Sequence, residues 1–233
     1  PGFIVNRCTR PYYGEALAML EEGRRAAEID GAMQAAGYRL GPFSLIDLIG
    51  SDINLAATEV IYDAFDRHPR YYPFATLRRH VLSGHLGRKS GIGFLYPDGK
   101  TAVPQDADAI VLRIEATLVN EAGWLSASGG PSETDIDTAI RLGLNFPRGP
   151  FEILEQHGHA KIRQTLATGL PRRPAFTPNG GTFTGNAGLL RQYPRKRPHS
   201  EDGRLQLCRG RRQATRRLDP RQYAANRLDQ LPP

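Results

Sequence analysis

Few side chains of this 233-residue sequence are spaced for metal or redox chemistry. His157 and His159 are separated by one glycine and could hold a metal, but no cysteine or carboxylate at ligand spacing supports this. We therefore interpret them as helix-end or surface residues and predict no metal site. Cys8 and Cys208 lie 200 positions apart and outside any CxxC pattern. This spacing argues against a disulfide scaffold and favours a reducing, cytoplasmic location.

A glycine-rich segment, residues 87–94 with the sequence GRKSGIGF, is the second place where chemistry could occur. Its glycines suggest a phosphate-binding loop at first sight. However, the segment lacks the GxxxxGK[ST] pattern, and it neither follows a predicted strand nor opens a predicted helix. We therefore predict that Gly87, Gly91 and Gly93 serve turns, and that the chain has neither a Walker loop nor a Rossmann fingerprint.

The elements that must position such residues are helices. Apolar residues recur at helical spacing through the first 170 residues, which predicts roughly eight amphipathic helices. The segments 3–5 and 93–96 are the only strand-like pieces. Ser51 is a predicted helix N-cap, and so is Ser132, which has Asp135 three residues later.

An internal repeat indicates that one helical unit is used twice. The matching segments are Glu15-Ala16 with Glu121-Ala122, Ile29-Asp30 with Ile136-Asp137, and Gly41-Pro42-Phe43 with Gly149-Pro150-Phe151, at offsets of 106, 107 and 108. In each copy the Gly-Pro-Phe turn is expected to open a helix, because proline suits the first helical position. The second copy is shorter, since nothing in it matches residues 70–94.

These patterns predict an all-α fold of two tandem helical repeats. Residues 1–96 form copy 1, 97–108 a linker, 109–170 a partial copy 2, and 171–233 a basic tail. The charge changes at the same boundary, because residues 1–170 carry 17 basic and 20 acidic side chains whereas residues 171–233 carry 14 and 4. We expect the tail to be disordered apart from a short helix near 218–228, since it has few apolar residues. A frame shift near residue 170 is an alternative origin of the tail.

The composition also excludes several partners. The tail lacks a nucleic-acid-binding motif and has few aromatic side chains that could stack on bases, so we do not expect it to bind nucleic acid. No apolar stretch approaches the roughly 20 residues needed to cross a bilayer, so no membrane span is predicted. The sequence begins with PGFIVNR, without Met or a leader peptide, and we expect it to be cut out of a longer chain.

Seven segments together form a pattern that is more specific than any single motif described above. They are residues 1–7 (PGFIVNR), 13–23 (YGEALAMLEEG), 29–30 (ID), 40–43 (LGPF), 47–50 (DLIG), 70–71 (RY) and 87–94 (GRKSGIGF). In order and spacing they resemble the C-terminal helical domain of the 3-hydroxyacyl-CoA dehydrogenases, from residue 1 to about 96, and residues from about 110 to 169 resemble the same domain again. The arrangement is similar to tandem 3-hydroxyacyl-CoA and 3-hydroxybutyryl-CoA dehydrogenases of bacterial phenylacetate and fatty-acid breakdown.

The resemblance implies hydride transfer from the 3-hydroxyl carbon of an acyl-CoA substrate to NAD, which requires a base, donors that hold the oxygen and a bound nicotinamide. By resemblance, Asn6 is the active-site Asn, placed where an extended segment enters a helix; a simple helix N-cap is the alternative for this residue. Lys89 matches a lysine that reaches the NAD site, where a compact cation suits a phosphate or ribose. Its alternative is a solvated loop lysine.

The resemblance also identifies what this sequence lacks. The family's NAD-binding domain, with its GxGxxG turn and a catalytic His with a Glu partner, normally precedes the PGFIVNR segment, and no residue here matches it. We therefore expect the chain alone to be inactive and to need an NAD-binding domain in a longer chain or a separate subunit.

A non-catalytic helical dimerisation module, or a degenerate fragment, is the alternative function. In the family the C-terminal domains pair, which implies either a dimer or a pseudo-dimer of the two copies within one chain.

Overall fold

The computed structural model describes residues 2–168, which form ten α-helices and two short 3-10 helices. The predicted all-α fold is confirmed, although the roughly eight helices expected were too few. None of the described helices is both long and apolar enough to span a membrane. The predicted basic tail and its short helix near 218–228 lie outside the described residues.

The helices fall into two groups that follow the repeat. Copy 1 contains α1 (Phe3–Cys8), α2 (Arg10–Glu21), α3 (Ala26–Ala35), α4 (Pro42–Ile49), α5 (Ser51–Ala64), η1 (Pro69–Tyr71), α6 (Ala75–Leu82) and η2 (Arg88–Ser90). Copy 2 contains α7 (Ala107–Ala127), α8 (Glu133–Leu144), α9 (Pro150–His157) and α10 (His159–Thr168). The bounds of α9 are those of α4 shifted by 108 residues, and α10 begins 108 residues after α5.

The first helix of the repeat is broken in copy 1 and continuous in copy 2. Helices α1 and α2 together correspond to α7, which ends 106 residues after α2. Pro11 stands near the start of α2, and the matching residue of α7 is Thr117. Proline lacks a backbone N–H and its ring clashes with the carbonyl four residues earlier, so copy 1 has a break between α1 and α2 where α7 has none.

A buried aspartate explains why both copies keep the Ile-Asp and Gly-Pro-Phe segments. The Asp30 carboxylate accepts two backbone N–H groups of the first turn of α4, each at 2.8 Å. Asp137 accepts the equivalent two groups of α9, at 2.8 and 3.1 Å. A Cβ atom on Gly41 or Gly149 would lie 2.3 Å from the capping aspartate. The glycine is therefore required by the close approach of the carboxylate that caps the next helix.

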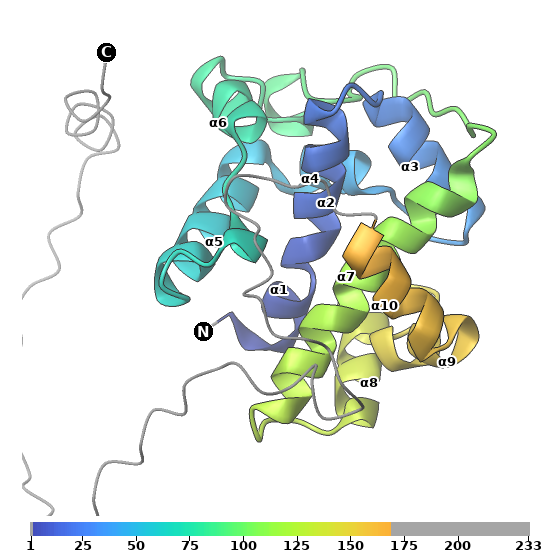
Figure 1. The fold of residues 1–233 in the computed structure, drawn as a ribbon. Helices are drawn as coiled ribbons and strands as arrows, with labels where there is room; N and C mark the ends of the chain where they lie inside the picture. Colours follow the sequence, from blue (N-terminus) through green and yellow to red (C-terminus); the bar gives the residue numbers. More distant parts are fainter. Residues whose placement is uncertain (1, 169–233) are drawn as a thin grey trace, which may run out of the picture. The chain divides into compact units, whose positions relative to one another are not determined.

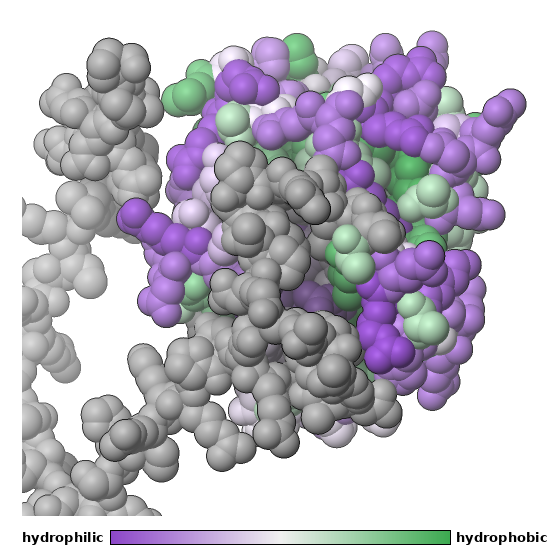
Figure 2. Space-filling model, viewed as in Figure 1, coloured by the Kyte–Doolittle hydropathy of each residue, from purple (hydrophilic) through white to green (hydrophobic). Residues whose placement is uncertain are grey.

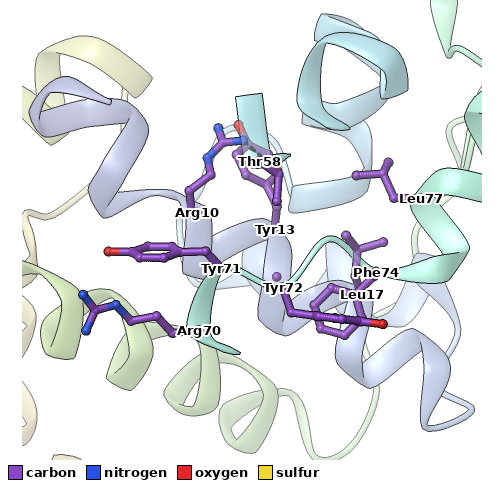
Figure 3. A pocket seen from close by; sticks show the side chains of 10 residues that line it. Arg10, Tyr13, Leu17, Thr58, Arg70, Tyr71, Tyr72, Phe74 and Leu77 are labelled. Carbon is purple, nitrogen blue, oxygen red and sulfur yellow. Dashed lines mark hydrogen bonds between the residues drawn. The ribbon is translucent and has the colours of Figure 1, made fainter. Parts of the chain in front are cut away.

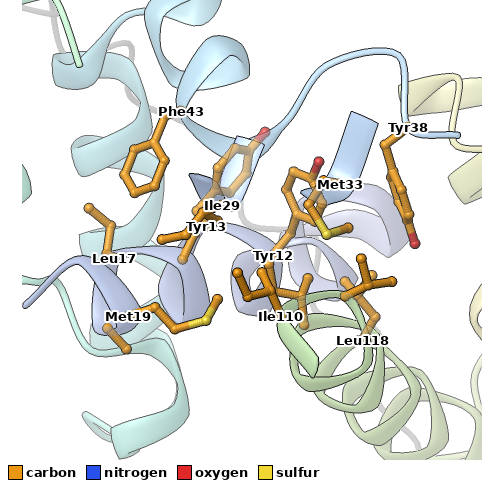
Figure 4. Packing of buried hydrophobic residues seen from close by; sticks show 14 of the residues in the cluster. Tyr12, Tyr13, Leu17, Met19, Ile29, Met33, Tyr38, Phe43, Ile110 and Leu118 are labelled. Carbon is orange, nitrogen blue, oxygen red and sulfur yellow. The ribbon is translucent and has the colours of Figure 1, made fainter. Parts of the chain in front are cut away.

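Helices α2 and α7 pack against each other at the centre of the described structure (Figure 1). Between the copies lies an aromatic cluster in which the rings of Tyr12 and Tyr38 each lie near that of Phe146, with centroid distances of 4.9 Å. Ile110 and Leu118 of α7 face this core (Figure 4). The two copies thus share one hydrophobic core.

Two ion pairs cross between the copies and are related by the repeat. Arg7 pairs with Glu121 at 2.6 Å, and Arg113 pairs with Glu15 at 2.6 Å. Adding 106 to Arg7 and Glu15 gives Arg113 and Glu121, so the two contacts are reciprocal. Reciprocal contacts are the signature of a two-fold interface. Copy 2 therefore packs on copy 1 as the second half of a pseudo-dimer.

Neither strand-like segment forms a strand, in agreement with the predicted all-α fold. Residues 3–5 lie in α1, where Val5 packs so closely on α8 that a Cβ on Gly143 would come within 2.8 Å of it. Helix packing thus overrides the strand preference of a short β-branched run. Residues 94–96 direct their backbone N–H groups at the carboxylate of Asp47, at 2.7–2.9 Å, so these groups are not available for a strand ladder.

The two predicted serine caps differ in outcome. Ser132 caps α8, because its hydroxyl accepts the Asp135 backbone N–H at 3.1 Å, so this prediction is confirmed. The N-cap of α5 is Gly50, and Ser51 is the first helical residue, so that prediction was wrong. Gly50 has φ 111°, a backbone conformation that favours glycine over serine at the cap position.

Candidate active-site wall

Asn6 is the fourth residue of α1, and it is exposed. The prediction that it stands where an extended segment enters a helix was wrong, because the helix already begins at Phe3. The N-cap alternative does not hold either, since Gly2 precedes α1 and Thr9 precedes α2. Within residues 2–168 the side-chain amide of Asn6 makes no hydrogen bond, so it is available to a ligand.

Arg10 fixes the helix that presents Asn6, a role that the sequence pattern does not show. Its Nε donates a hydrogen bond to the backbone carbonyl of Asn6 at 3.0 Å, and its Nη1 donates to Thr58 Oγ1 at 3.2 Å and the Asn54 carbonyl at 3.4 Å. Figure 3 shows Arg10 beside Thr58 and Tyr13, and its guanidinium lies 4.9 Å from the Tyr13 ring centroid. Burial lowers the pKa of Arg10. Arg10 therefore ties Asn6 to α5.

Lys89 lies in η2 and forms an ion pair with Asp52 in the first turn of α5. Their side chains are 41% and 39% exposed, so the pair is open to solvent. Burial alone would raise the pKa of Asp52, but the hydrogen bond from Lys89 holds that pKa below its usual value. Lys89 is thus oriented by a partner, and its ammonium stays accessible to an anionic group.

The loop that carries Lys89 is folded around Asp47. This carboxylate accepts the three backbone N–H groups of residues 94–96, and a Cβ on Gly87 or Gly93 would lie within 2.3 Å of Asp47 atoms. Gly87 and Gly91 adopt positive φ values of 85° and 79° and serve turns, whereas Gly93 is needed for close approach. Asp47 belongs to the DLIG segment, so the motif that carried the resemblance also contained the residue that organises the loop.

The structure does not bring Asn6 and Lys89 into contact, but it fixes both relative to α5. Lys89 pairs with Asp52 in the first turn of that helix, and Arg10 bonds to the carbonyl of Asn54 in the same turn and to Thr58 in the next. The outer face of α5 is apolar, with Ile53 53% and Val60 66% exposed. The amide of Asn6 and the ammonium of Lys89 are thus both held to α5, a helix that also exposes apolar side chains.

The histidines provide no metal centre in the part of the chain that the structure describes. His157 ends α9 and His159 begins α10, and no group of three or more His, Cys, Asp or Glu side chains that could hold a metal occurs in residues 2–168. His157 instead pairs with Glu115, at 2.7 Å between Nε2 and Oε2.

Comparison with known proteins identifies the family of this chain. The family model of the 3-hydroxyacyl-CoA dehydrogenase C-terminal domain matches residues 2–96 and, a second time, residues 110–179. The chain belongs to this family. The first matched segment contains the helices of copy 1, and the second covers most of α7 and all of α8, α9 and α10.

Individual relatives extend this comparison. The chain is 30% identical to a 3-hydroxyadipyl-CoA dehydrogenase of Escherichia coli, over 71% of this chain and 54% of the relative. A crystal structure of 3-hydroxybutyryl-CoA dehydrogenase from Escherichia coli matches with a TM-score of 0.62 and 28% identity, over 75% of this chain and 58% of that one. An (S)-3-hydroxybutyryl-CoA dehydrogenase from Ralstonia eutropha is 38% identical over 45% of this chain and 35% of its own, with a TM-score of 0.39. The chain spans little more than half the length of the two Escherichia coli relatives.

Proposed function

We propose that this chain supplies one wall of the active site of an NAD-dependent 3-hydroxyacyl-CoA dehydrogenase, which oxidises 3-hydroxyacyl-CoA to 3-oxoacyl-CoA in cytoplasmic fatty-acid or phenylacetate breakdown. The observation that carries the proposal is the exposed Asn6 amide, which lies in the PGFIVNR segment and makes no hydrogen bond to the described residues. Arg10 holds the backbone of Asn6, so the amide is presented from a fixed helix. A donor whose backbone is already held needs less reorganisation when it binds a reacting oxygen than one on a free segment.

The oxidation requires two transfers from the substrate. The hydrogen on the 3-carbon leaves with its electron pair, and the 3-hydroxyl proton leaves for a base. NAD, when bound, is the acceptor of that hydride. Asn6 donates its amide N–H to the substrate oxygen that becomes the 3-oxo group and thereby orients the 3-carbon. The base is expected in the NAD-binding domain, within a longer chain or on a separate subunit, so we propose that this chain alone is inactive.

Lys89 fits the cofactor side of the same wall. Its ammonium is exposed and lies beside the N-terminus of α5, where helix dipoles favour anionic groups. In the described structure Asp52 occupies that position. We propose that a phosphate or ribose oxygen of NAD shares Lys89 with Asp52, while the cofactor is held mainly by the NAD-binding domain.

Pairing of helical domains is the second candidate function. The reciprocal Arg7–Glu121 and Arg113–Glu15 ion pairs favour it, because the copies complete a two-fold interface within one chain. We propose that the chain therefore uses copy 2 as its own dimer partner. Light scattering would give the mass of one chain at low micromolar concentration, and a mass of two chains would contradict this proposal.

Fusion to an NAD-binding domain tests the proposed activity. The chain and the same chain preceded by the NAD-binding domain of a related dehydrogenase are each given NAD with 3-hydroxybutyryl-CoA or 3-hydroxyadipyl-CoA, and NADH absorbance is followed. We expect NADH only from the fusion. Activity of the chain alone would show that it holds its own base. A fusion that binds NAD yet yields no NADH with either substrate would overturn the dehydrogenase proposal.

A further inference from the structure

Copy 2 carries an open pocket of about 430 Å³ that the dehydrogenase wall does not include. Its polar lining comes from α7, α9, α10 and the segment before α9. We call it the copy 2 pocket and define it by Asp108, Glu115, Arg148, Gln156, His157 and Lys161. The surface over α9 and α10 is predominantly hydrophilic in the view of Figure 2.

The repeat relates this pocket to the wall in copy 1. Subtracting the repeat offsets of 106 for α7 and 108 for α9 and α10 converts copy 2 positions to copy 1 positions. The pairs are Leu112 with Asn6, Gln156 with Leu48, His157 with Ile49, and Lys161 with Ile53. The position of Asn6 is thus occupied by the apolar Leu112 in copy 2. Conversely, three apolar positions of copy 1 hold polar side chains in copy 2. The equivalent surfaces of the two copies therefore differ in polarity.

A buried carboxylate organises the wall of the pocket. The Glu115 side chain is 1% exposed and accepts hydrogen bonds from Tyr38 Oη at 3.0 Å and Arg148 Nη2 at 3.1 Å. It also pairs with His157 Nε2 at 2.7 Å. A buried carboxylate persists only when it is well partnered, so these contacts fix Arg148 and His157 in place.

Arg148 and Lys161 still have hydrogen-bond donors that the contacts with Glu115 do not use. Arg148 uses only Nη2 in its hydrogen bonds; within residues 2–168 its Nη1 makes none, and its Nε is buried without a partner. Lys161 also lines the pocket and is exposed. Arg148 and Lys161 both line the cavity, and guanidinium and ammonium groups are the ones that bind carboxylate and phosphate oxygens. Asp108 lies exposed in the lining and adds negative charge, which favours a small anion over an extended polyphosphate.

We propose that the copy 2 pocket binds a small anion, a carboxylate or a phosphate group, through Arg148 and Lys161. The site is independent of the proposed dehydrogenase chemistry, because it is built from copy 2 and from residues that do not touch Asn6 or Lys89. Copy 2 is then both the pseudo-dimer partner of copy 1 and a ligand-binding module.

NMR titration of the 233-residue chain with inorganic phosphate and, separately, with succinate tests this site at constant ionic strength. We expect saturable shifts of the Gln156 and His157 signals with at least one probe, and the two probes distinguish phosphate from carboxylate preference. Lys161→Gln should weaken binding about tenfold, as expected for loss of a charge-assisted hydrogen bond. Lys161→Arg should retain it.

Lys100→Gln is the matched control, because it removes the same charge from an exposed residue outside the pocket. This variant should bind the anion as the unmodified chain does. All three substitutions lie on the surface, so none depends on a buried residue. Equal weakening by Lys161→Gln and Lys100→Gln would show general charge attraction and overturn the site. Shifts that do not saturate with either probe would also overturn it.

Discussion

The two reciprocal ion pairs between the copies should contribute unequally to the free energy of unfolding. Glu121 is fully buried and lies within 2.6–2.9 Å of Arg7 and Arg70, while Tyr71 donates a hydrogen bond to it at 2.5 Å. The side chains of these two arginines are only 11% and 8% exposed. Replacing Glu121 by Gln keeps the volume but leaves two nearly buried cations without their anion. Breaking a buried pair in this way costs about 3–5 kcal/mol of unfolding free energy.

The counterpart Glu15→Gln should cost less. Glu15 is 8% exposed, and its partner Arg113 keeps a second carboxylate, Glu22, at 2.7 Å. Because Arg113 remains paired, we expect a loss of about 1–2 kcal/mol. Asp63→Asn is the control, since its ion pair with Arg67 is exposed on both sides and should contribute less than about 0.5 kcal/mol.

Urea unfolding at pH 7, followed by far-UV circular dichroism, gives the three free energies. The structure predicts the order Glu121→Gln, then Glu15→Gln, then Asp63→Asn, with unchanged m-values. Equal losses for Glu121→Gln and Glu15→Gln, or a loss below about 1 kcal/mol for Glu121→Gln, would refute the packing of copy 2 on copy 1 described above.

Three further predictions follow from buried positions. Gly41→Ala should lower the unfolding free energy by at least about 2 kcal/mol, whereas Gly123→Ala, in an open part of α7, should raise it by about 0.5–1 kcal/mol in the same urea assay. Burial raises the pKa of Asp30 to about 6, so its contribution to stability is fully present below about pH 4 and is lost as the pH rises through about 6. Urea unfolding between about pH 4 and 7 should show this loss, about 3 kcal/mol, in the unmodified chain and not in Asp30→Asn. Burial raises the pKa of Cys8 to about 12, so in a Cys208→Ser background the native thiol should resist a thiol reagent at pH 8 and react only on unfolding.

The repeat was predictable because its signals are local. The glycine and the aspartate are required by a contact inside the copy, as when Asp30 caps α4 beside Gly41, and the proline suits the first helical position. These residues therefore keep their spacing in the sequence and mark both copies. Helix periodicity likewise identified most of the helices, since each has one apolar face.

The contacts between copies could not be read from a single periodic segment, because Arg7 and Glu121 are 114 positions apart. One signal was present nevertheless: Arg7 and Glu15 recur as Arg113 and Glu121 at the same offset of 106. Charged residues that repeat in a core-facing helix indicate partners across a two-fold axis. The role of Arg10 could not be predicted in this way, because its hydrogen bonds go to backbone carbonyls and one hydroxyl, and these acceptors do not form a sequence motif.

The polar contacts within copy 2 could not be predicted from the sequence either. His157 was predicted to be a helix-end or surface residue. It does end α9, but its pairing with Glu115 was not predicted. The pairing joins α7 to the end of α9, and neither residue lies in a motif. Comparing copies position by position, rather than searching for motifs, would have shown that Ile49 and His157 occupy one place in the repeat.

The most direct test of the central claim is the turnover number of Asn6→Ala in the fusion with an NAD-binding domain. Removing a donor to a reacting oxygen typically lowers kcat by about 100-fold or more, so we expect a fall of that size with stability unchanged. Asn120→Ala in α7 is the control and should keep full activity. A kcat for Asn6→Ala within about twofold of that of the control would contradict the assignment of Asn6 to the active-site wall.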